Sequence, residues 1–262
     1  MKKLGLALGA GGSRGIAHIG FLKALEDNGI KPDYISGTSM GSVVGSFYAM
    51  GISPSYMIKV ALSLRARDLL DLSPIAIKNG TLLKSKKMSA LLHRYLHDTL
   101  IEDLKIPFAC VGLDIISGKK VVFDQGEVAT AVQASSSIPM VFAPVAYENM
   151  LVADGGPLCR VPVEEVRNLG ADVVVGVDVL GPVREMEEIK SILGYTLRII
   201  DIYDSTVNDY ALKQNPPDML CVPELGDMSQ YKIDSAQMQR AYEMGYESAL
   251  SIIDELKKKL RD

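Results

Sequence analysis

Ser39 lies at the centre of a G-x-S-x-G segment, Gly37-Thr38-Ser39-Met40-Gly41. Between a strand and a helix, this spacing forms a nucleophile elbow, because the glycines allow a sharp turn with the serine projecting at its apex. A serine held in this way attacks acyl carbonyl carbons once a base takes its proton. The same string also arises by chance in glycine-rich turns, so its surroundings decide between a nucleophile and an ordinary turn.

The three histidines of the chain do not supply the usual base for a serine nucleophile. His18, His93 and His97 all precede Asp154, whereas α/β-hydrolases carry serine, acid and histidine in that order. His93 and His97 are four residues apart, a spacing that can bind a metal on a helix, but Arg94 stands where an H-E-x-x-H motif has glutamate. We therefore interpret this pair as exposed helix histidines and expect His18 to make a structural hydrogen bond.

Asp154 is the best remaining candidate for the base, because it ends a short apolar segment and is followed by Gly155 and Gly156. A carboxylate held against a serine hydroxyl in a partly dry cleft can take its proton as the oxyanion forms. The residues thus predict a dyad of Ser39 and Asp154. Asp-Gly-Gly is also a plain turn signal, and on its own it would be interpreted as a turn.

Residues 9–15, Gly-Ala-Gly-Gly-Ser-Arg-Gly, form a glycine-rich loop between an apolar strand and a helical pattern. Consecutive glycine N–H groups beside a helix N-terminus make an anion-binding nest, which is what an oxyanion hole requires. A dinucleotide-binding turn has the same strand-loop-helix order. The third glycine of that fingerprint falls on Arg14, however, so cofactor binding is the weaker interpretation.

The order of the remaining elements predicts an α/β fold. Strands are expected at 4–8, 33–36, 107–115, 120–123, 150–153, 172–179 and 219–222, and helices at 16–28, 40–50, 128–135, 161–169, 185–213 and 235–260. Such alternation predicts a central, mostly parallel sheet with helices on both faces, and sites at the carboxyl ends of its strands. The two prolines within residues 136–144 predict an extended path there.

Composition narrows the class of protein. The chain has 262 residues, 48% of them hydrophobic, and its net charge of -4 argues against nucleic-acid binding. The three cysteines are widely spaced, which indicates reduced thiols of a cytoplasmic protein. The longest apolar runs are too short to span a bilayer. Residues 69–77 are unusually apolar for a connection, which suits core packing better than a lid or a lipid-facing loop.

Taken together, these segments resemble the patatin-like phospholipase family, in its bacterial, single-domain form. Residues 11–15 resemble its oxyanion-hole loop, 37–41 its nucleophile elbow and 154–156 its dyad aspartate motif, and the block Ser137-Ile138-Pro139 with Phe142-Ala143-Pro144 resembles the one that precedes that aspartate. We expect one domain over residues 1–262, with the motifs within 4–180 and a C-terminal extension over 181–262. Ala10 and Met140 stand where the family often has glycine, which bears on the shape of the acyl pocket.

The resemblance implies a three-layer α/β/α sandwich that hydrolyses lipid acyl esters through an acyl-enzyme, with neither metal nor cofactor. It implies Ser39 as nucleophile and Asp154 as base. The implied oxyanion-hole donors are the backbone N–H groups of Gly11, Gly12, Ser13 and Arg14, and the implied motif glycines are Gly9, Gly15, Gly37, Gly41, Gly155 and Gly156. The Arg14 side chain would either shape the loop or meet a phosphate head group.

Two other functions stay open at this point. The same acyl-serine could transfer its acyl group to an alcohol or thiol, or the chain could be a non-catalytic lipid-binding or regulatory protein. A lipid substrate also implies transient contact with the inner face of the membrane, for which residues 69–77 and the lysines within 84–87 are the candidates. The oligomeric state and the natural lipid are not specified by these motifs.

Overall fold

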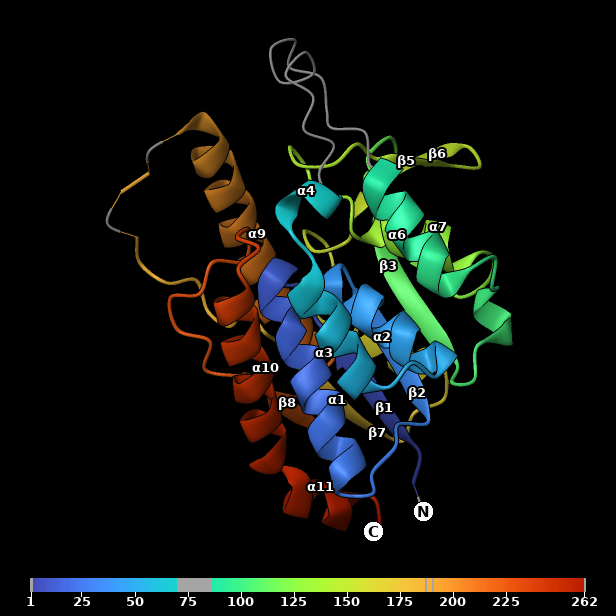
Figure 1. Ribbon diagram of the computed structural model, residues 1–262. Coiled ribbons are helices and arrows are strands. Elements are labelled where there is room, and N and C mark those ends of the chain that lie inside the picture. Colours follow the sequence, from blue (N-terminus) through green and yellow to red (C-terminus); the bar gives the residue numbers. More distant parts are fainter. Residues whose placement is uncertain (1, 70–85, 187, 190, 262) are drawn as a thin grey trace.

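The fold is built on a central sheet of eight strands in the order β5-β6-β3-β2-β1-β7-β8, with β4 paired to β3 outside that order. The computed structural model describes residues 2–69, 86–186, 188–189 and 191–261 (Figure 1). The strands are β1 (Leu4–Leu8), β2 (Tyr34–Thr38), β3 (Phe108–Asp114), β4 (Lys119–Phe123), β5 (Val145–Tyr147), β6 (Met150–Asp154), β7 (Val173–Val177) and β8 (Met219–Cys221). The five neighbouring strands β3, β2, β1, β7 and β8 are parallel to one another. The pairs β3–β4, β3–β6 and β5–β6 are antiparallel and lie at one side of the sheet.

Helices cover both faces of this sheet (Figure 1). They are α1 (Ala17–Asp27), α2 (Met40–Met50), α3 (Pro54–Ser63), α4 (Ala66–Leu69), α6 (Lys86–Leu96), α7 (Val128–Ser135), α8 (Val163–Asn168), α9 (Ile192–Gln214), α10 (Ser235–Leu250) and α11 (Ile253–Lys259), with 3-10 turns η1 (Gly12–Ile16) and η2 (Ile101–Asp103). The predicted α/β class with a mostly parallel sheet between helices is confirmed.

The central strand β1 shows why the fold has three layers. Its side chains alternate between the two faces of the sheet, as they must in a pleated strand. Leu4, Leu6 and Leu8 join the large core cluster that also contains residues of α1, α2 and α10. Ala7 points to the other face, where it packs with Val166 of α8. Because apolar residues occupy both faces, β1 is buried throughout.

One edge of β3 brings the ends of two other strands together. Along that edge β2 runs parallel to β3 and pairs Thr38 with Val111, and β6 runs antiparallel and pairs Asp154 with Gly112. The opposite edge of β3 belongs to β4. Since β2 and β6 approach each other head-on, the residue that follows β2 and the residue that ends β6 must meet.

Several expected elements need correction. Residues 136–144 are not extended, because Val141 and Phe142 both donate their N–H to the Ile138 carbonyl and close a helical turn. The helix expected over 235–260 is two helices, α10 and α11, separated by a turn at 251–252. The helix expected from 185 begins only at Ile192, and β5 was not foreseen.

The expected apolar connection at 69–77 lies outside the described residues, apart from Leu69 at the end of α4. Among the described residues, no helix is both long enough and apolar enough to cross a membrane.

Helices α1 and α10 pack against each other at unusually close range. A Cβ atom on Gly20 of α1 would lie 1.9 Å from the Tyr242 carbonyl oxygen, and one on Gly245 of α10 would lie 2.0 Å from the Ala17 carbonyl oxygen. Both glycines are therefore needed for the two backbones to approach, and this contact joins residues 235–250 to the core.

We predict that Gly245→Ala destabilises the protein by about 1–3 kcal/mol, because the added methyl group forces the helices apart. The free energy of unfolding, measured in urea, checks this. Gly194→Ala in α9 is the matched control, since its Cβ would meet no backbone atom and would lie 3.2 Å from the Ser191 hydroxyl and 3.9 Å from the Ile189 side chain. If Gly245→Ala were as stable as this control, the close packing of α1 and α10 would be contradicted.

Candidate active site

Ser39 directly follows β2 and is the N-cap residue of α2. Its backbone conformation is one that residues other than glycine rarely adopt. Its φ is 54° and its ψ is -123°. The neighbouring glycines make this turn possible, because a Cβ on Gly41 would lie 2.1 Å from the Leu8 carbonyl oxygen and one on Gly37 would lie 2.5 Å from that of Gly41. Strain of this kind persists only where the surrounding structure enforces it, and it is common at functional sites.

The Ser39 hydroxyl donates a hydrogen bond to Oδ2 of Asp154 at 2.5 Å. Both residues are buried, with exposed fractions of 4% and 5%. The other carboxylate oxygen, Oδ1, accepts the Gly156 N–H at 2.8 Å. The end of α7 and the two residues after it hold both backbones, since Ser39 N–H donates to the Ser135 hydroxyl and Asp154 N–H donates to the Ser137 carbonyl, each at 3.0 Å.

Burial changes the acidity of this carboxyl group. Desolvation raises the pKa of Asp154 to about 6, and the hydrogen bonds from Ser39 and Gly156 oppose that rise. A carboxylate with such a pKa is a stronger base than an exposed one and is still ionised at neutral pH.

The glycine-rich loop of residues 9–15 faces the same cavity, but only part of it is free to bind an anion. Ser13 N–H donates to the Gln230 carbonyl at 2.9 Å and Arg14 N–H donates to the Gly11 carbonyl at 3.0 Å. Within the described part of the chain, the N–H groups of Gly11 and Gly12 have no such acceptor. Of the four N–H groups expected to bind an oxyanion, those of Ser13 and Arg14 are thus already bonded to carbonyl oxygens, whereas those of Gly11 and Gly12 remain available.

Arg14 is used as an anchor for this loop. Its guanidinium donates to three backbone carbonyls, those of Met228 at 2.6 Å, Gly226 at 3.1 Å and Leu180 at 3.2 Å. Of the two roles expected for Arg14, the contacts fit the shaping of the loop. They also show that the glycine-rich loop is held by residues 226–230, far away in the sequence.

The cavity over Ser39 and Asp154 has a volume of about 50 Å³. Its walls combine the sequence motifs with residues that sequence reasoning missed. The residues that line it are Ala10, Gly11, Gly12, Ser39, Ile138, Pro139, Asp154, Gly156, Pro157, Leu180, Ile200, Asp201, Asp204, Gln230 and Tyr231. The last five come from the C-terminal extension over residues 181–262, so this extension completes the cavity.

A buried ionic network supports that wall. Arg160 Nε donates to Asp204 at 3.0 Å, and its Nη1 donates to Asp178 at 3.3 Å and to the Gly181 carbonyl at 2.8 Å. Burial raises the pKa of Asp204 to about 7, while Arg160 opposes the rise. The spacing of Asp201, Asp204 and Asn208 on α9 was an available signal, because residues three and seven apart share one helix face.

The histidines take no part in this cavity. His18 is fully buried and its Nε2 donates to the Gly9 carbonyl at 2.8 Å, so the expected structural hydrogen bond is confirmed. Burial lowers the pKa of His18 to about 4, which keeps the ring neutral. His97 is exposed at the end of α6, and His93 is half-buried and lies near Glu127.

Known proteins with similar sequences include an uncharacterized NTE family protein of Mycobacterium tuberculosis, 36% identical over 189 residues. That match covers 71% of this chain and 52% of the relative. The lysophospholipase nte1 of Aspergillus fumigatus is 34% identical over 184 residues, which cover 68% of this chain and 12% of the relative. The chain thus spans about half of the first relative and a small part of the second.

Two solved structures share the fold at low sequence identity. VipD from Legionella pneumophila has a TM-score of 0.57 at 16% identity, covering 97% of this chain and 67% of that structure. The type III effector ExoU of Pseudomonas aeruginosa has a TM-score of 0.51 at 14% identity, covering 97% of this chain and 53% of that structure.

A family model described as patatin-like phospholipase matches residues 6–167, a span that contains the glycine-rich loop, the elbow and Asp154. That span is more than half of the chain. The protein therefore belongs to the patatin-like phospholipase family.

Proposed function

We propose that this protein hydrolyses acyl esters of lipids, such as phospholipids or lysophospholipids, through a dyad of Ser39 and Asp154. The observation that carries this proposal is the 2.5 Å hydrogen bond between the buried Ser39 hydroxyl and the Asp154 carboxylate. Family membership and a relative named lysophospholipase support a lipid ester as the substrate.

In the first half of the reaction, Ser39 Oγ attacks the acyl carbonyl carbon while Asp154 takes its proton. The developing negative charge falls on the carbonyl oxygen, for which the N–H groups of Gly11 and Gly12 are the available donors. Each such donor typically contributes about a hundredfold or more in rate. The alcohol then leaves with the proton from Asp154, and the acyl group stays on Ser39.

In the second half, Asp154 takes a proton from water, which attacks the acyl-serine and releases the fatty acid. Asp154 then returns that proton to Ser39 Oγ, which regenerates the free enzyme. These steps use one base and two backbone donors and need no metal ion. Because the cavity has a volume of only about 50 Å³, it can hold the reacting ester group, and the rest of a lipid must extend beyond it.

Acyl transfer, non-catalytic lipid binding and contact with a membrane stay predictions. Adding an alcohol or thiol acceptor to the assay tests the first, because a transferase yields the acylated acceptor in addition to fatty acid.

We predict that Ser39→Ala abolishes hydrolysis, with a loss of about 10⁴-fold or more in kcat/KM, and that Asp154→Asn costs about 10²–10⁴-fold, the usual contribution of a general base. Release of fatty acid from lysophospholipid measures both. Ser63→Ala and Asp209→Asn are matched controls at exposed positions and should keep full activity. A folded Ser39→Ala protein with normal activity would refute the mechanism.

We also predict that kcat/KM falls tenfold per pH unit below about pH 6, because a protonated Asp154 cannot accept the serine proton. A profile of fatty acid release between pH 4.5 and 8 measures this. Asp204 titrates in the same range, since burial raises its pKa to about 7. The fall in kcat/KM below about pH 6 should therefore remain in Asp204→Asn. If this variant lost that fall, the titrating group would be Asp204 instead of Asp154.

A further inference from the structure

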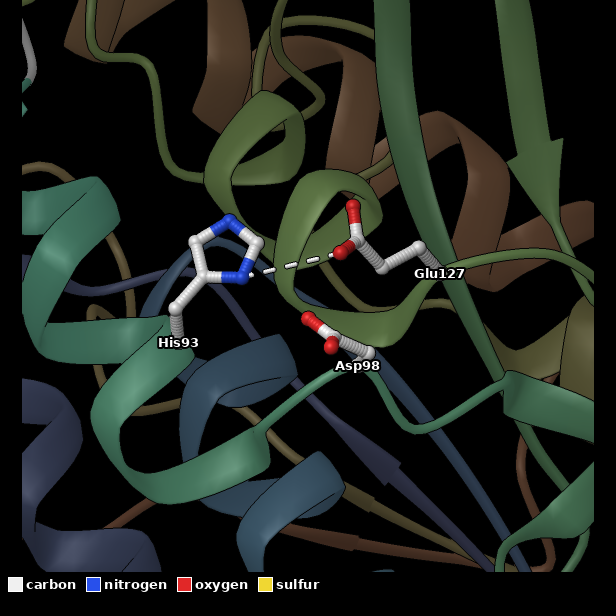
Figure 2. Close-up of side chains that lie close together, drawn as sticks. All are labelled: His93, Asp98 and Glu127. Carbon is white, nitrogen blue, oxygen red and sulfur yellow. Dashed lines mark ion pairs between the residues drawn. The ribbon is translucent and has the colours of Figure 1, made fainter.

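Three metal-ligating side chains gather away from the dyad. His93 lies in the last turns of α6, Asp98 in the turn that follows and Glu127 directly before α7 (Figure 2). One imidazole nitrogen and one oxygen of each carboxylate all lie within 4.8 Å of one another. Figure 2 shows the three polar ends directed toward a common space. None of the three lines the cavity over Ser39.

The backbone fixes the positions of these three residues. α6 is pinned to the core by Leu92 and Leu96, which are buried on either side of His93 along the helix. Beyond Asp98, the chain pairs with the segment around Glu127, since Val128 N–H donates to the Thr99 carbonyl at 3.0 Å and Ile101 N–H donates to the Gly126 carbonyl at 2.8 Å. The backbone positions from which the three side chains extend are therefore held in place by the core and by backbone hydrogen bonds.

Charges and distances within the cluster favour a bound cation. Nδ1 of His93 and Oε1 of Glu127 are 3.6 Å apart, which is too long for a hydrogen bond. Two ligand atoms on a tetrahedral cation with bonds of about 2.1 Å lie about 3.4 Å apart, which is close to that distance. In the described part of the chain, the Asp98 carboxylate has no hydrogen bond or ion pair, although it lies beside a second carboxylate. A cation between the carboxylates of Asp98 and Glu127 would offset the electrostatic repulsion between their two negative charges.

The surroundings meet two further requirements of a metal site. The second oxygen of Glu127, Oε2, accepts a hydrogen bond from the Thr130 hydroxyl, which orients the carboxylate as outer-shell partners of metal ligands do. His93 also lines an open groove of about 610 Å³ beside α7, so water and ions can reach the ring.

We propose that His93, Asp98 and Glu127 bind one divalent transition-metal ion, with Zn²⁺ as the best match. One imidazole nitrogen with two carboxylate oxygens suits Zn²⁺, whereas Mg²⁺ and Ca²⁺ prefer oxygen ligands alone. Water would complete the coordination. The site is separate from the proposed hydrolysis, and its ion would join α6 to the start of α7. Because α7 ends at Ser135, which accepts the Ser39 N–H, the ion would also brace the helix that supports the elbow.

The test is a calorimetric titration of ZnCl₂ into the 262-residue protein after removal of metal by a chelator and dialysis. We expect one ion per chain and a rise of several degrees in melting temperature at saturating Zn²⁺. His93→Asn and Glu127→Gln should each weaken binding at least tenfold. CaCl₂ and MgCl₂ should bind far more weakly.

His97→Asn is the matched control, because it makes the same substitution four residues further along, at an exposed position outside the cluster. Asparagine also tolerates the left-handed backbone found there, with a φ of 52°. His97→Asn should bind Zn²⁺ like the unmodified protein. Circular dichroism of each metal-free variant confirms that it is folded.

Cobalt(II) gives a readout that does not depend on variants. Proton NMR of the unmodified protein with one equivalent of Co²⁺ should show strongly shifted, non-exchangeable ring C–H signals from a single imidazole, that of His93. Absence of those signals, no Zn²⁺ binding, equal binding by His93→Asn and His97→Asn, or a preference for Ca²⁺ would each overturn the proposal.

Discussion

The edge of β3 that carries both β2 and β6 is the constraint on which the candidate site depends. Two strands that approach each other along one edge end beside consecutive residues, Val111 and Gly112. Ser39 and Asp154 are 115 positions apart in the chain, yet the pairing of their strands with β3 brings Ser39 Oγ to 2.5 Å from Asp154 Oδ2. The contact between Ser39 and Asp154 therefore needs the pairing of both β2 and β6 with β3, and a defect in the register of either strand would separate the two side chains.

This arrangement is unfavourable when each residue is considered alone. Ser39 holds a positive φ, and Asp154 is buried without a positively charged partner at hydrogen-bond distance among the described residues. The close approaches of Gly37 and Gly41 and the core around β1 keep the turn in place. Burial has a chemical consequence as well, because it gives Asp154 a pKa of about 6 and makes it a better base.

The C-terminal third supports the site from the opposite side. Residues 226–230 accept hydrogen bonds from Arg14 and Ser13 and so hold the glycine-rich loop. Arg160 joins the segment after Asp154 to Asp204 of α9. Arg14 and Arg160 both connect segments that are distant in the sequence through buried or partly buried hydrogen bonds. Neither donates a hydrogen bond to Ser39 or Asp154, so we infer that both stabilise the positions of the surrounding segments.

The sequence by itself determined the local features: the glycine loop, the elbow, the aspartate at a strand end, and helices such as 40–50 and 128–135. These follow from periodicity and from glycine positions, which are properties of neighbouring residues. Only the tertiary structure decided which residues meet. It left two of the four expected oxyanion donors free, completed the cavity with Asp201, Asp204 and Tyr231, and joined His93 to Asp98 and Glu127 instead of His97. Such contacts depend on strand register and helix packing between distant segments, about which the local pattern carries no information.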